Sequence, residues 1–257
     1  MPRNSTPEDI RLRLFRRRPP ENPHLKYVRQ IEAGTPIEYH GITVPVTEGH
    51  MPLPILIQIA EDAYERPELR AAEGMVQSGD RILEMGTGLG IVSGLISRMA
   101  EGVEIRSFEA NPNLLPHIAE LHRLNDITNV SVTHAMLEPD PASDTRMFHV
   151  HKYFSEGSIF QTEMSEEAIE IPVLDINAVV QEFKPTVLVC DIEGAEEVVI
   201  PNCDLSTLRA LVLELHPAVM SRMGMKRIFD ACLGAGLYPR IELSSEQVVA
   251  FEKIEQG

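Results

Sequence analysis

The spacing of hydrophobic positions changes at about residue 80. From there, short apolar runs alternate with runs in which apolar residues recur every three or four positions, as expected for strands and helices in turn. The runs expected to form strands are residues 81–85, 103–110, 129–137, 185–194 and 210–217. The runs expected to form helices are residues 90–100, 113–125 and 225–236, with one more after residue 175. The alternation predicts an α/β fold with a doubly wound, mostly parallel sheet, because parallel strands need crossover connections.

Two further patterns modify this sheet. Residues 237–243 and 247–253 alternate apolar and polar positions around the turn "SSE", which predicts a C-terminal antiparallel hairpin at the sheet edge. Residues 138–170 break the alternation of strands and helices, and we expect an irregular insertion there.

The first fifty residues are rich in proline and predict an irregular N-terminal arm. Within it we expect one short helix at about residues 7–18 and a strand pair at residues 38–46. Residues 52–76 have helical spacing interrupted at Pro67, which predicts two helices. We therefore divide the chain into an arm, residues 1–50, and one larger domain, residues 51–257.

Charge and composition exclude several classes of function. The net charge of −16 argues against a surface for nucleic acid or an anionic membrane, because phosphates would be repelled. The basic run at residues 10–18 is typical of a solvated face or of an oligomer contact, so a homo-oligomer through the arm stays an alternative. Three cysteines without CxxC spacing, no apolar run long enough to cross a bilayer and no signal-peptide core predict a soluble, cytoplasmic protein.

Three glycines mark the junction between the first strand and its helix. Gly86, Gly88 and Gly90 occupy every second position there, although glycine weakens both kinds of element, so we expect a ligand close to the backbone. Such a turn places N–H groups and a helix N-terminus at the carboxyl edge of the sheet, where open α/β sheets bind ligands. Glu109, at the end of the next strand, is placed to bind ribose hydroxyls. The pattern predicts a nucleoside-containing ligand.

The order of residues in this turn favours S-adenosylmethionine over NAD. A dinucleotide fingerprint would have a third glycine where Ile91 stands. Glu84, two residues before Gly86, suits a ligand with a positively charged amino group and would repel a pyrophosphate. A nicotinamide-dependent oxidoreductase on a related sheet stays the alternative, as does a protein that binds S-adenosylmethionine without catalysis.

The segments "DRILEMGTGLGIVS", "SFEANP", "LVCDIEGAE" and "LVLELHP", in this order and spacing, resemble the FkbM family of class I S-adenosylmethionine-dependent methyltransferases. The resemblance spans residues 64–253, and "AYERPE" and "IPVLDI" also fit its pattern. The first motif departs from it, reading "EMGTG" where the family usually has "DIGAN". The resemblance implies methyl transfer to a hydroxyl of a sugar or natural product, so we expect a small hydroxylated acceptor. The predicted cofactor-binding residues are Glu84, Gly86, Thr87, Gly88, Gly90, Glu109, Ala110, Asn111, Ala135, Met136 and Asp191.

Asp191 and His216 are the candidate catalytic residues, because both follow strands that open towards the methyl group. His216 has an unperturbed pKa near neutrality, which suits a general base, although a histidine bonding backbone at a strand end is the alternative. Asp191 has two further open roles, binding the methionine amino group or the acceptor hydroxyl. Glu193, Glu196 and other acids nearby suggest Mg²⁺ or Mn²⁺, but acids also complement a helix N-terminus, and we expect no metal.

The acceptor side is assigned to the insertion at residues 138–170. It interrupts the sheet pattern at the carboxyl edge, where loops of this topology carry specificity. His149, His151 and Tyr153 offer both apolar walls and polar groups, and we predict that they contact the acceptor. An ordinary surface strand is the alternative for this segment.

Overall fold

The computed structural model of the protein describes residues 34–46, 51, 53–151 and 165–254. Three predictions lie outside these residues: the short helix at residues 7–18, the oligomer contact through the basic run, and the acceptor contact of Tyr153. For His151 the structure describes the backbone only.

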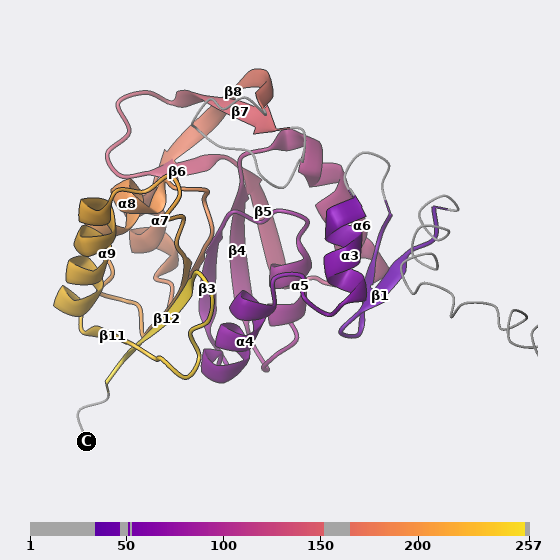
Figure 1. Cartoon of the computed structure of the whole chain (residues 1–257), viewed down its shortest axis with the longest axis horizontal. Helices are drawn as coiled ribbons and strands as arrows, with labels where there is room; N and C mark the ends of the chain where they lie inside the picture. Colours follow the sequence, from indigo (N-terminus) through magenta and orange to yellow (C-terminus); the bar gives the residue numbers. More distant parts are fainter. Residues whose placement is uncertain (1–33, 47–50, 52, 152–164, 255–257) are drawn as a thin grey trace, which may run out of the picture.

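A seven-stranded sheet forms the centre of the molecule (Figure 1). Its strands are β3 (Arg81–Met85), β4 (Glu104–Glu109), β5 (Val130–His134), β9 (Val187–Cys190), β10 (Ala210–Glu214), β11 (Leu237–Pro239) and β12 (Val248–Lys253). They are ordered β11-β12-β10-β9-β3-β4-β5, and β12 alone runs antiparallel to its neighbours in this sheet. This confirms the expected fold class, a mostly parallel doubly wound sheet with a C-terminal antiparallel hairpin. The strand order reverses between β3 and β9, which is the usual ligand-binding position in open α/β sheets.

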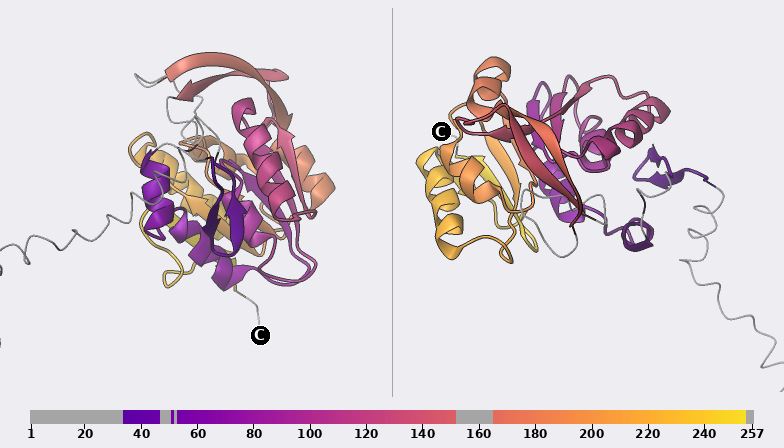
Figure 2. Two further views of the ribbon diagram at one scale, coloured as in Figure 1. Left: turned by 90° about the vertical axis from the view of Figure 1, so that its right-hand side faces the viewer. Right: turned by 90° about the horizontal axis from the view of Figure 1, so that it is seen from above.

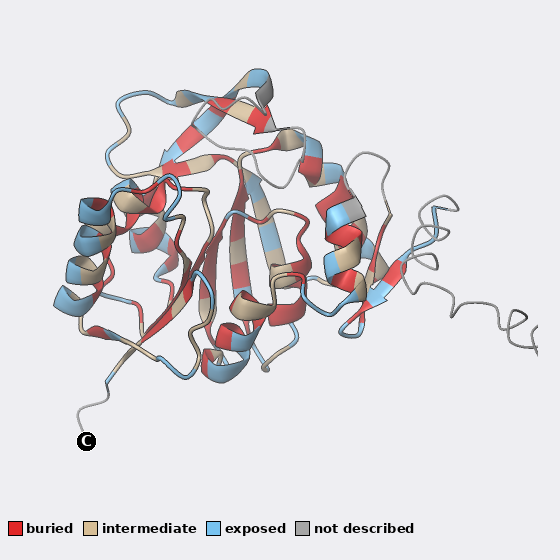
Figure 3. Ribbon diagram, viewed as in Figure 1, coloured by how far each residue is buried: buried red, intermediate tan, exposed pale blue. Residues whose placement is uncertain are grey.

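Helices cover both faces of the sheet (Figure 2). One face carries α4 (Arg66–Met75), α5 (Ile91–Ile96) and α6 (Leu115–Leu124), with the 3₁₀ turn Pro112–Leu114 before α6. The other carries α7 (Ile176–Phe183), α8 (Glu196–Val199), the 3₁₀ turn Ile200–Asn202 and α9 (Arg222–Gly234). Successive residues of a strand point to opposite faces, so Ile82 packs against α4 and Leu83 against α7. Burial on both faces explains why these strands are almost continuously apolar (Figure 3).

A second, three-stranded sheet crosses the carboxyl ends of the main strands (Figures 1 and 2). It consists of β6 (Met136–Glu138), β7 (Thr145–His151) and β8 (Ser165–Asp175), ordered β6-β8-β7. The expectation of an irregular insertion is therefore wrong for the described part of residues 138–170. Along β7, Phe148 and Val150 are separated by the polar His149, and both pack on Ile171. This packing stabilises a strand whose sequence has too few apolar residues to be recognised as one.

The N-terminal elements pack beside α5 and α6. They are β1 (Ile37–Tyr39), β2 (Ile42–Val44) and α3 (Leu53–Ala60), and their buried side chains belong to one hydrophobic cluster with those helices. The expected strand pair is thus present. Two helices also occur over residues 53–75, but the break falls at residues 61–65, and Pro67 lies in the first turn of α4, where its missing N–H needs no partner.

Asp80 ties together the amino ends of three neighbouring strands. Its carboxylate accepts hydrogen bonds from Thr186 Oγ1 at 2.7 Å, Arg209 Nε at 3.1 Å and the Gln77 N–H at 2.7 Å. The three residues Asp80, Thr186 and Arg209 lie just before β3, β9 and β10, at the amino edge of the sheet. The opposite, carboxyl edge is therefore free for a site. None of the helices in the described ranges has the length and apolar character required to span a membrane.

Candidate functional site

A cleft opens at the carboxyl ends of β3, β4 and β9, where the strand order reverses. It contains about 1070 Å³ of empty space, a volume that includes open solvent. Most of the predicted cofactor-binding residues line it: Glu84, Gly86, Thr87, Gly88, Glu109, Ala110, Asn111, Ala135, Met136 and Asp191. Gly90 does not line it. The structure thus brings ten of the residues together, while their binding roles stay predictions.

The three glycines serve different purposes. All have positive φ, but a Cβ on Gly86 would lie 1.7 Å from the carbonyl oxygen of Asp191, and one on Gly90 would lie 3.1 Å from Ile118 Cγ2. At these two positions the close neighbour is the protein itself, rather than the ligand expected from the sequence. A Cβ on Gly88, with φ +56°, would meet no atom of the described residues within 4 Å. Gly88 is therefore the glycine whose open side a ligand can use.

Glu109 links the glycine turn to the end of β4. Its Oε2 accepts the Gly88 N–H at 2.8 Å and its Oε1 accepts the Asn111 N–H at 2.7 Å. Burial raises the pKa of Glu109 to about 7, although these backbone donors favour the charged form. Each carboxylate oxygen has a second lone pair, so Glu109 can also accept two ribose hydroxyls.

Glu84 lies at the bottom of the same cleft and is 2% exposed. Ser107 Oγ, on the neighbouring strand, donates a hydrogen bond of 2.5 Å to its Oε2. Burial raises the pKa of Glu84 to about 7 against the effect of this hydroxyl. The hydroxyl of Thr87, which also lines the cleft, is buried; it lies near enough to Glu84 to favour that carboxylate's charged form, but it makes no well-formed hydrogen bond to any described residue. A buried hydroxyl without a partner is costly, and a ligand hydrogen bond at Thr87 would remove that cost.

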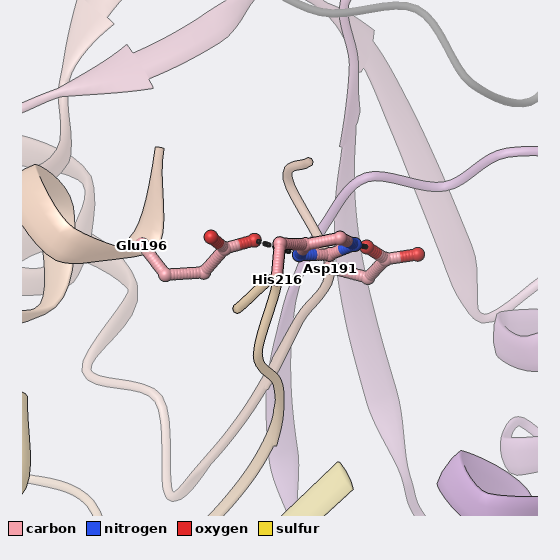
Figure 4. A group of neighbouring side chains, drawn as sticks. All are labelled: Asp191, Glu196 and His216. Atoms are coloured by element: carbon pink, nitrogen blue, oxygen red, sulfur yellow. Dashed lines mark hydrogen bonds and ion pairs between the residues drawn. The ribbon is translucent and has the colours of Figure 1, made fainter. Parts of the chain in front are cut away.

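Asp191, His216 and Glu196 form a line of side chains beside the cleft (Figure 4). His216 Nδ1 lies 3.1 Å from Glu196 Oε1, and its Nε2 lies 3.5 Å from Asp191 Oδ1 and 3.3 Å from Glu193 Oε2. Glu196 is fully buried and also accepts the Ile192 N–H at 2.9 Å. Asp191 lines the cleft and His216 does not. Asp191 is therefore the member of this line that a ligand reaches first.

The electrostatics of the line differ from those expected for a free histidine base. Burial by itself would lower the pKa of His216, but the hydrogen bond to Glu196 and the charges of Glu196 and Glu193 outweigh it and raise the pKa above its ordinary value. Burial and the negative charges of Glu65 and Glu214 raise the pKa of Asp191 well above its usual range. His216 thus favours its charged form, in which Nε2–H can donate to Asp191.

A second group of carboxylates adjoins this line and joins Glu214, one of the acids noted at the strand ends, to Glu65 and Glu68, which the sequence analysis did not single out. Glu65, Glu68 and Glu214 each place one oxygen within 4.8 Å of the others. At that separation and an effective dielectric of 20, two full negative charges repel by about 3 kcal/mol. Accordingly, burial first and neighbouring charges such as Glu214 next raise the pKa of Glu68 to about 7. Acids within "AYERPE" were the available signal, but nothing in the sequence links them to the end of β10.

The predicted acceptor residues lie on β7 or outside the described residues. Phe148 lines the cleft and packs with Ala110 and Met136. His149 is the next residue and therefore points to the opposite face of β7, away from this cluster. The side chain of His151 and all of Tyr153 lie outside the described residues, so the acceptor contacts of these three residues stay predictions. Phe148 was missed because the sequence does not tell which face of β7 meets the cleft.

No protein-family model matches the chain, and no curated protein matches it. Solved structures similar to it include a precorrin-6y C5,15-methyltransferase from Geobacter metallireducens, at 12% identity and a TM-score of 0.44, covering 74% of this chain and 89% of that one. A TehB-like SAM-dependent methyltransferase from Corynebacterium glutamicum is similar at 14% identity and a TM-score of 0.40, covering 91% and 97%.

Fibrillarin from Aeropyrum pernix, crystallised with natively bound S-adenosyl-L-methionine, is similar at 14% identity and a TM-score of 0.40, covering 72% of this chain and 74% of that one. Likeness at this level does not establish a function. The function of the chain has to be inferred from the geometry of its own cleft.

Proposed function

We propose that the chain is an S-adenosylmethionine-dependent methyltransferase. The observation that carries the proposal is the pairing of Glu109 with the Gly88 N–H at the reversal of strand order, next to the open side of Gly88. A carboxylate at the end of the second strand, fixed against the glycine turn, is suited to holding the two hydroxyls of a ribose.

The residues around the cleft fit each part of this cofactor. Glu109 suits the ribose, Thr87 offers a buried hydroxyl that makes no well-formed hydrogen bond to any described residue, and the negative charge of Glu84 suits an amino group. Phe148, packed with Ala110 and Met136, offers an apolar surface for the adenine ring. When bound, S-adenosylmethionine supplies an electrophilic methyl group on a sulfonium centre.

NAD fits the same cleft less well. Its pyrophosphate would lie against the glycine turn, within reach of the buried carboxyl of Glu84. Ile91 is fully buried at the position where a third glycine would relieve packing in a dinucleotide site. The antiparallel β12 between β10 and β11 likewise differs from a nicotinamide-binding sheet.

The chain's own groups can orient an acceptor hydroxyl and take up its proton. Asp191 lines the cleft, so its carboxylate can accept a hydrogen bond from the hydroxyl. His216, which does not line the cleft, is held at Nδ1 by Glu196 and fixes the orientation of Asp191. During methyl transfer from a bound cofactor, Asp191 would take up the proton that the acceptor hydroxyl loses. Positioning and proton transfer are the two contributions that this reaction needs from the protein.

We further propose an FkbM-like enzyme that methylates a hydroxyl on a sugar or natural product. This assignment is supported by the order of the segments "EMGTG", "FEANP", "DIEGAE" and "ELHP" in the sequence, and by the residues of the first three segments that line the cleft. The absence of disulfides among Cys190, Cys203 and Cys232 supports a cytoplasmic location.

Binding measurements on the full chain test the cofactor. In calorimetric titrations we expect S-adenosylmethionine and S-adenosylhomocysteine to bind and NAD to bind much more weakly or not at all. The Glu109→Gln variant should bind S-adenosylmethionine about 5- to 150-fold more weakly, the equivalent of roughly 1–3 kcal/mol for hydrogen bonds lost to a charged group.

Glu104→Gln is the matched control, because Glu104 lies on the same strand but is exposed. It should bind the cofactor like the unmodified chain. Tighter binding of NAD than of S-adenosylmethionine, or equal affinity in both variants, would contradict the proposal. Release of S-adenosylhomocysteine with a panel of hydroxylated acceptors then separates an enzyme from a protein that only binds the cofactor.

A further inference from the structure

Three glutamates from two distant parts of the chain meet beside the cleft. Glu65 precedes α4 and Glu68 lies in its first turn, so the two residues are neighbours on one side of the helix. Glu214 ends β10, a strand that packs against α4. One carboxylate oxygen from each lies within 4.8 Å of the other two, and Glu65 and Glu68 line the cleft.

No positive side chain among the described residues makes a direct ion pair with this group, although the charge of His216 acts on Glu214 and partly offsets the rise in its pKa. Among the described residues, no lysine, arginine or histidine lies within 4.0 Å of these three carboxylates, and the ion-pair contacts of His216 go to Asp191, Glu193 and Glu196 instead. Repulsion among the three therefore has to be relieved by protons or by a bound cation.

The burial of Glu68 is the independent sign of a ligand. Glu68 is only 5% exposed and lines the cleft, and its Oε2 is buried without a hydrogen-bond partner among the described residues. A helix dipole accounts for an acid in the first turn of α4, but it does not account for Glu214 on a strand or for the convergence of three carboxylates. Buried carboxylate oxygens are nearly always paired or bound to a metal, so one without a partner points to a missing ligand.

We propose that Glu65, Glu68 and Glu214 bind a divalent cation of the hard class, such as Mg²⁺, Mn²⁺ or Ca²⁺. All three donors are carboxylate oxygens, the ligands that these ions prefer, and no sulfur or nitrogen donor is part of the group. The site departs from the sequence-based expectation of no metal, which considered only residues near the ends of β9 and β10. It is separate from the glycine turn and Glu109, so it does not rest on the proposed cofactor.

Mn²⁺ is the probe for this site. Titration of the full chain with MnCl₂, followed by the loss of the electron paramagnetic resonance signal of free Mn²⁺, should show one ion bound with a Kd below about 1 mM. Mg²⁺ and Ca²⁺ in excess should displace it. Glu68→Gln and Glu214→Gln, on different elements, should each weaken binding at least about tenfold, because affinity depends on the number of charged ligands.

Glu73→Gln is the matched control, since it removes the same charge from an exposed position on α4. It should bind Mn²⁺ like the unmodified chain, and circular dichroism should show that all variants are folded. No binding to the unmodified chain up to 1 mM, or equal affinity in Glu68→Gln, Glu214→Gln and Glu73→Gln, would overturn the site. S-adenosylmethionine affinity, measured on the same proteins without metal, reports separately on the proposed function.

Discussion

The glycines of the turn separate a packing role from a binding role at the level of single residues. A methyl group on Gly86 would overlap the carbonyl of Asp191, whereas one on Gly88 would enter open space. The same substitution, glycine to alanine, therefore tests two different properties at positions two residues apart.

We expect Gly88→Ala to fold with a loss of about 1–2 kcal/mol in the free energy of unfolding, the cost of alanine at positive φ. Its affinity for S-adenosylmethionine should fall by at least tenfold, about 1.4 kcal/mol, because the methyl group fills the ligand's side of the turn. Gly86→Ala should lose several kcal/mol of stability, because backbone must move to accommodate it. Urea denaturation measures the stability of each variant, and calorimetric titration measures its affinity for S-adenosylmethionine. A Gly88→Ala variant with full affinity would remove Gly88 from the site.

The proton acceptor is also a question about single side chains. Asp191→Asn keeps the shape of the side chain but not its basicity, so we expect kcat for methyl transfer to fall by about 10²–10⁴-fold. His216→Gln should cost less, because His216 acts on Asp191 from behind and does not line the cleft. Cofactor affinity should change little in His216→Gln, because His216 does not line the cleft.

Asp230→Asn, at an exposed position on α9, is the control for that comparison. Its kcat should match that of the unmodified chain. Equal kcat in Asp191→Asn and the control would show that another group takes the proton.

Among the elements, β7 is the one whose two faces differ most in expected function. Phe148 faces the cleft and its small apolar cluster, and His149 faces away. We expect Phe148→Ala to weaken S-adenosylmethionine binding by about 5- to 30-fold, the equivalent of roughly 1–2 kcal/mol of lost apolar contact. His149→Ala should leave cofactor affinity unchanged. Calorimetric titration of both variants measures these affinities. A larger loss of affinity in His149→Ala than in Phe148→Ala would show that His149, and not Phe148, faces the cleft.

The strands and helices of the main sheet could be predicted because their apolar patterns are local. Residues 82–85 and 210–213 are buried on both faces and apolar except for Glu84, as a buried parallel strand requires. β7 could not be predicted in this way, because Phe148 and Val150 alternate with polar residues and depend on Ile171 of a partner strand. The pattern of a strand shows that it has two faces, but tertiary packing decides which one meets the cleft.

The candidate site could be predicted only in part, for a related reason. Glu109 is linked to the glycine turn by a characteristic spacing, so the sequence identifies both halves of the proposed ribose site. Glu65, Glu68 and Glu214 come together through the packing of α4 on β10, and no spacing rule joins residues so far apart. The role of Gly86 was also hidden, because its close neighbour is the backbone of another strand.

At the scale of the whole molecule, buried carboxyls make stability depend on pH. The pKa values of Glu84 and Glu109 are raised to about 7 from the ordinary value of 4.5, with burial as the main cause. At pH values between 4.5 and about 7, the folded chain binds more protons than the unfolded chain. The free energy of unfolding should therefore fall as pH rises through this window, by at most about 3 kcal/mol for each group.

Urea denaturation at intervals from pH 5 to pH 8 measures this dependence. Glu84→Gln should flatten it, since the amide does not titrate, while Glu104→Gln, at an exposed position, should leave it unchanged. Stability that rises with pH across the window would show that Glu84 and Glu109 are charged more readily than their burial implies.

The place of β12 in the sheet also bears on how the chain is made. β11 is hydrogen-bonded to the main sheet only through β12, the later of the two strands in the sequence. During synthesis β3, β4 and β5 can pair as they emerge. By contrast, β11 and the outer edge of β10 stay unpaired until β12 has been made. A stalled ribosome that has not yet completed β12 would therefore present an unpaired edge of β10 to other nascent chains, and unpaired edges favour aggregation. The final strand closes that edge.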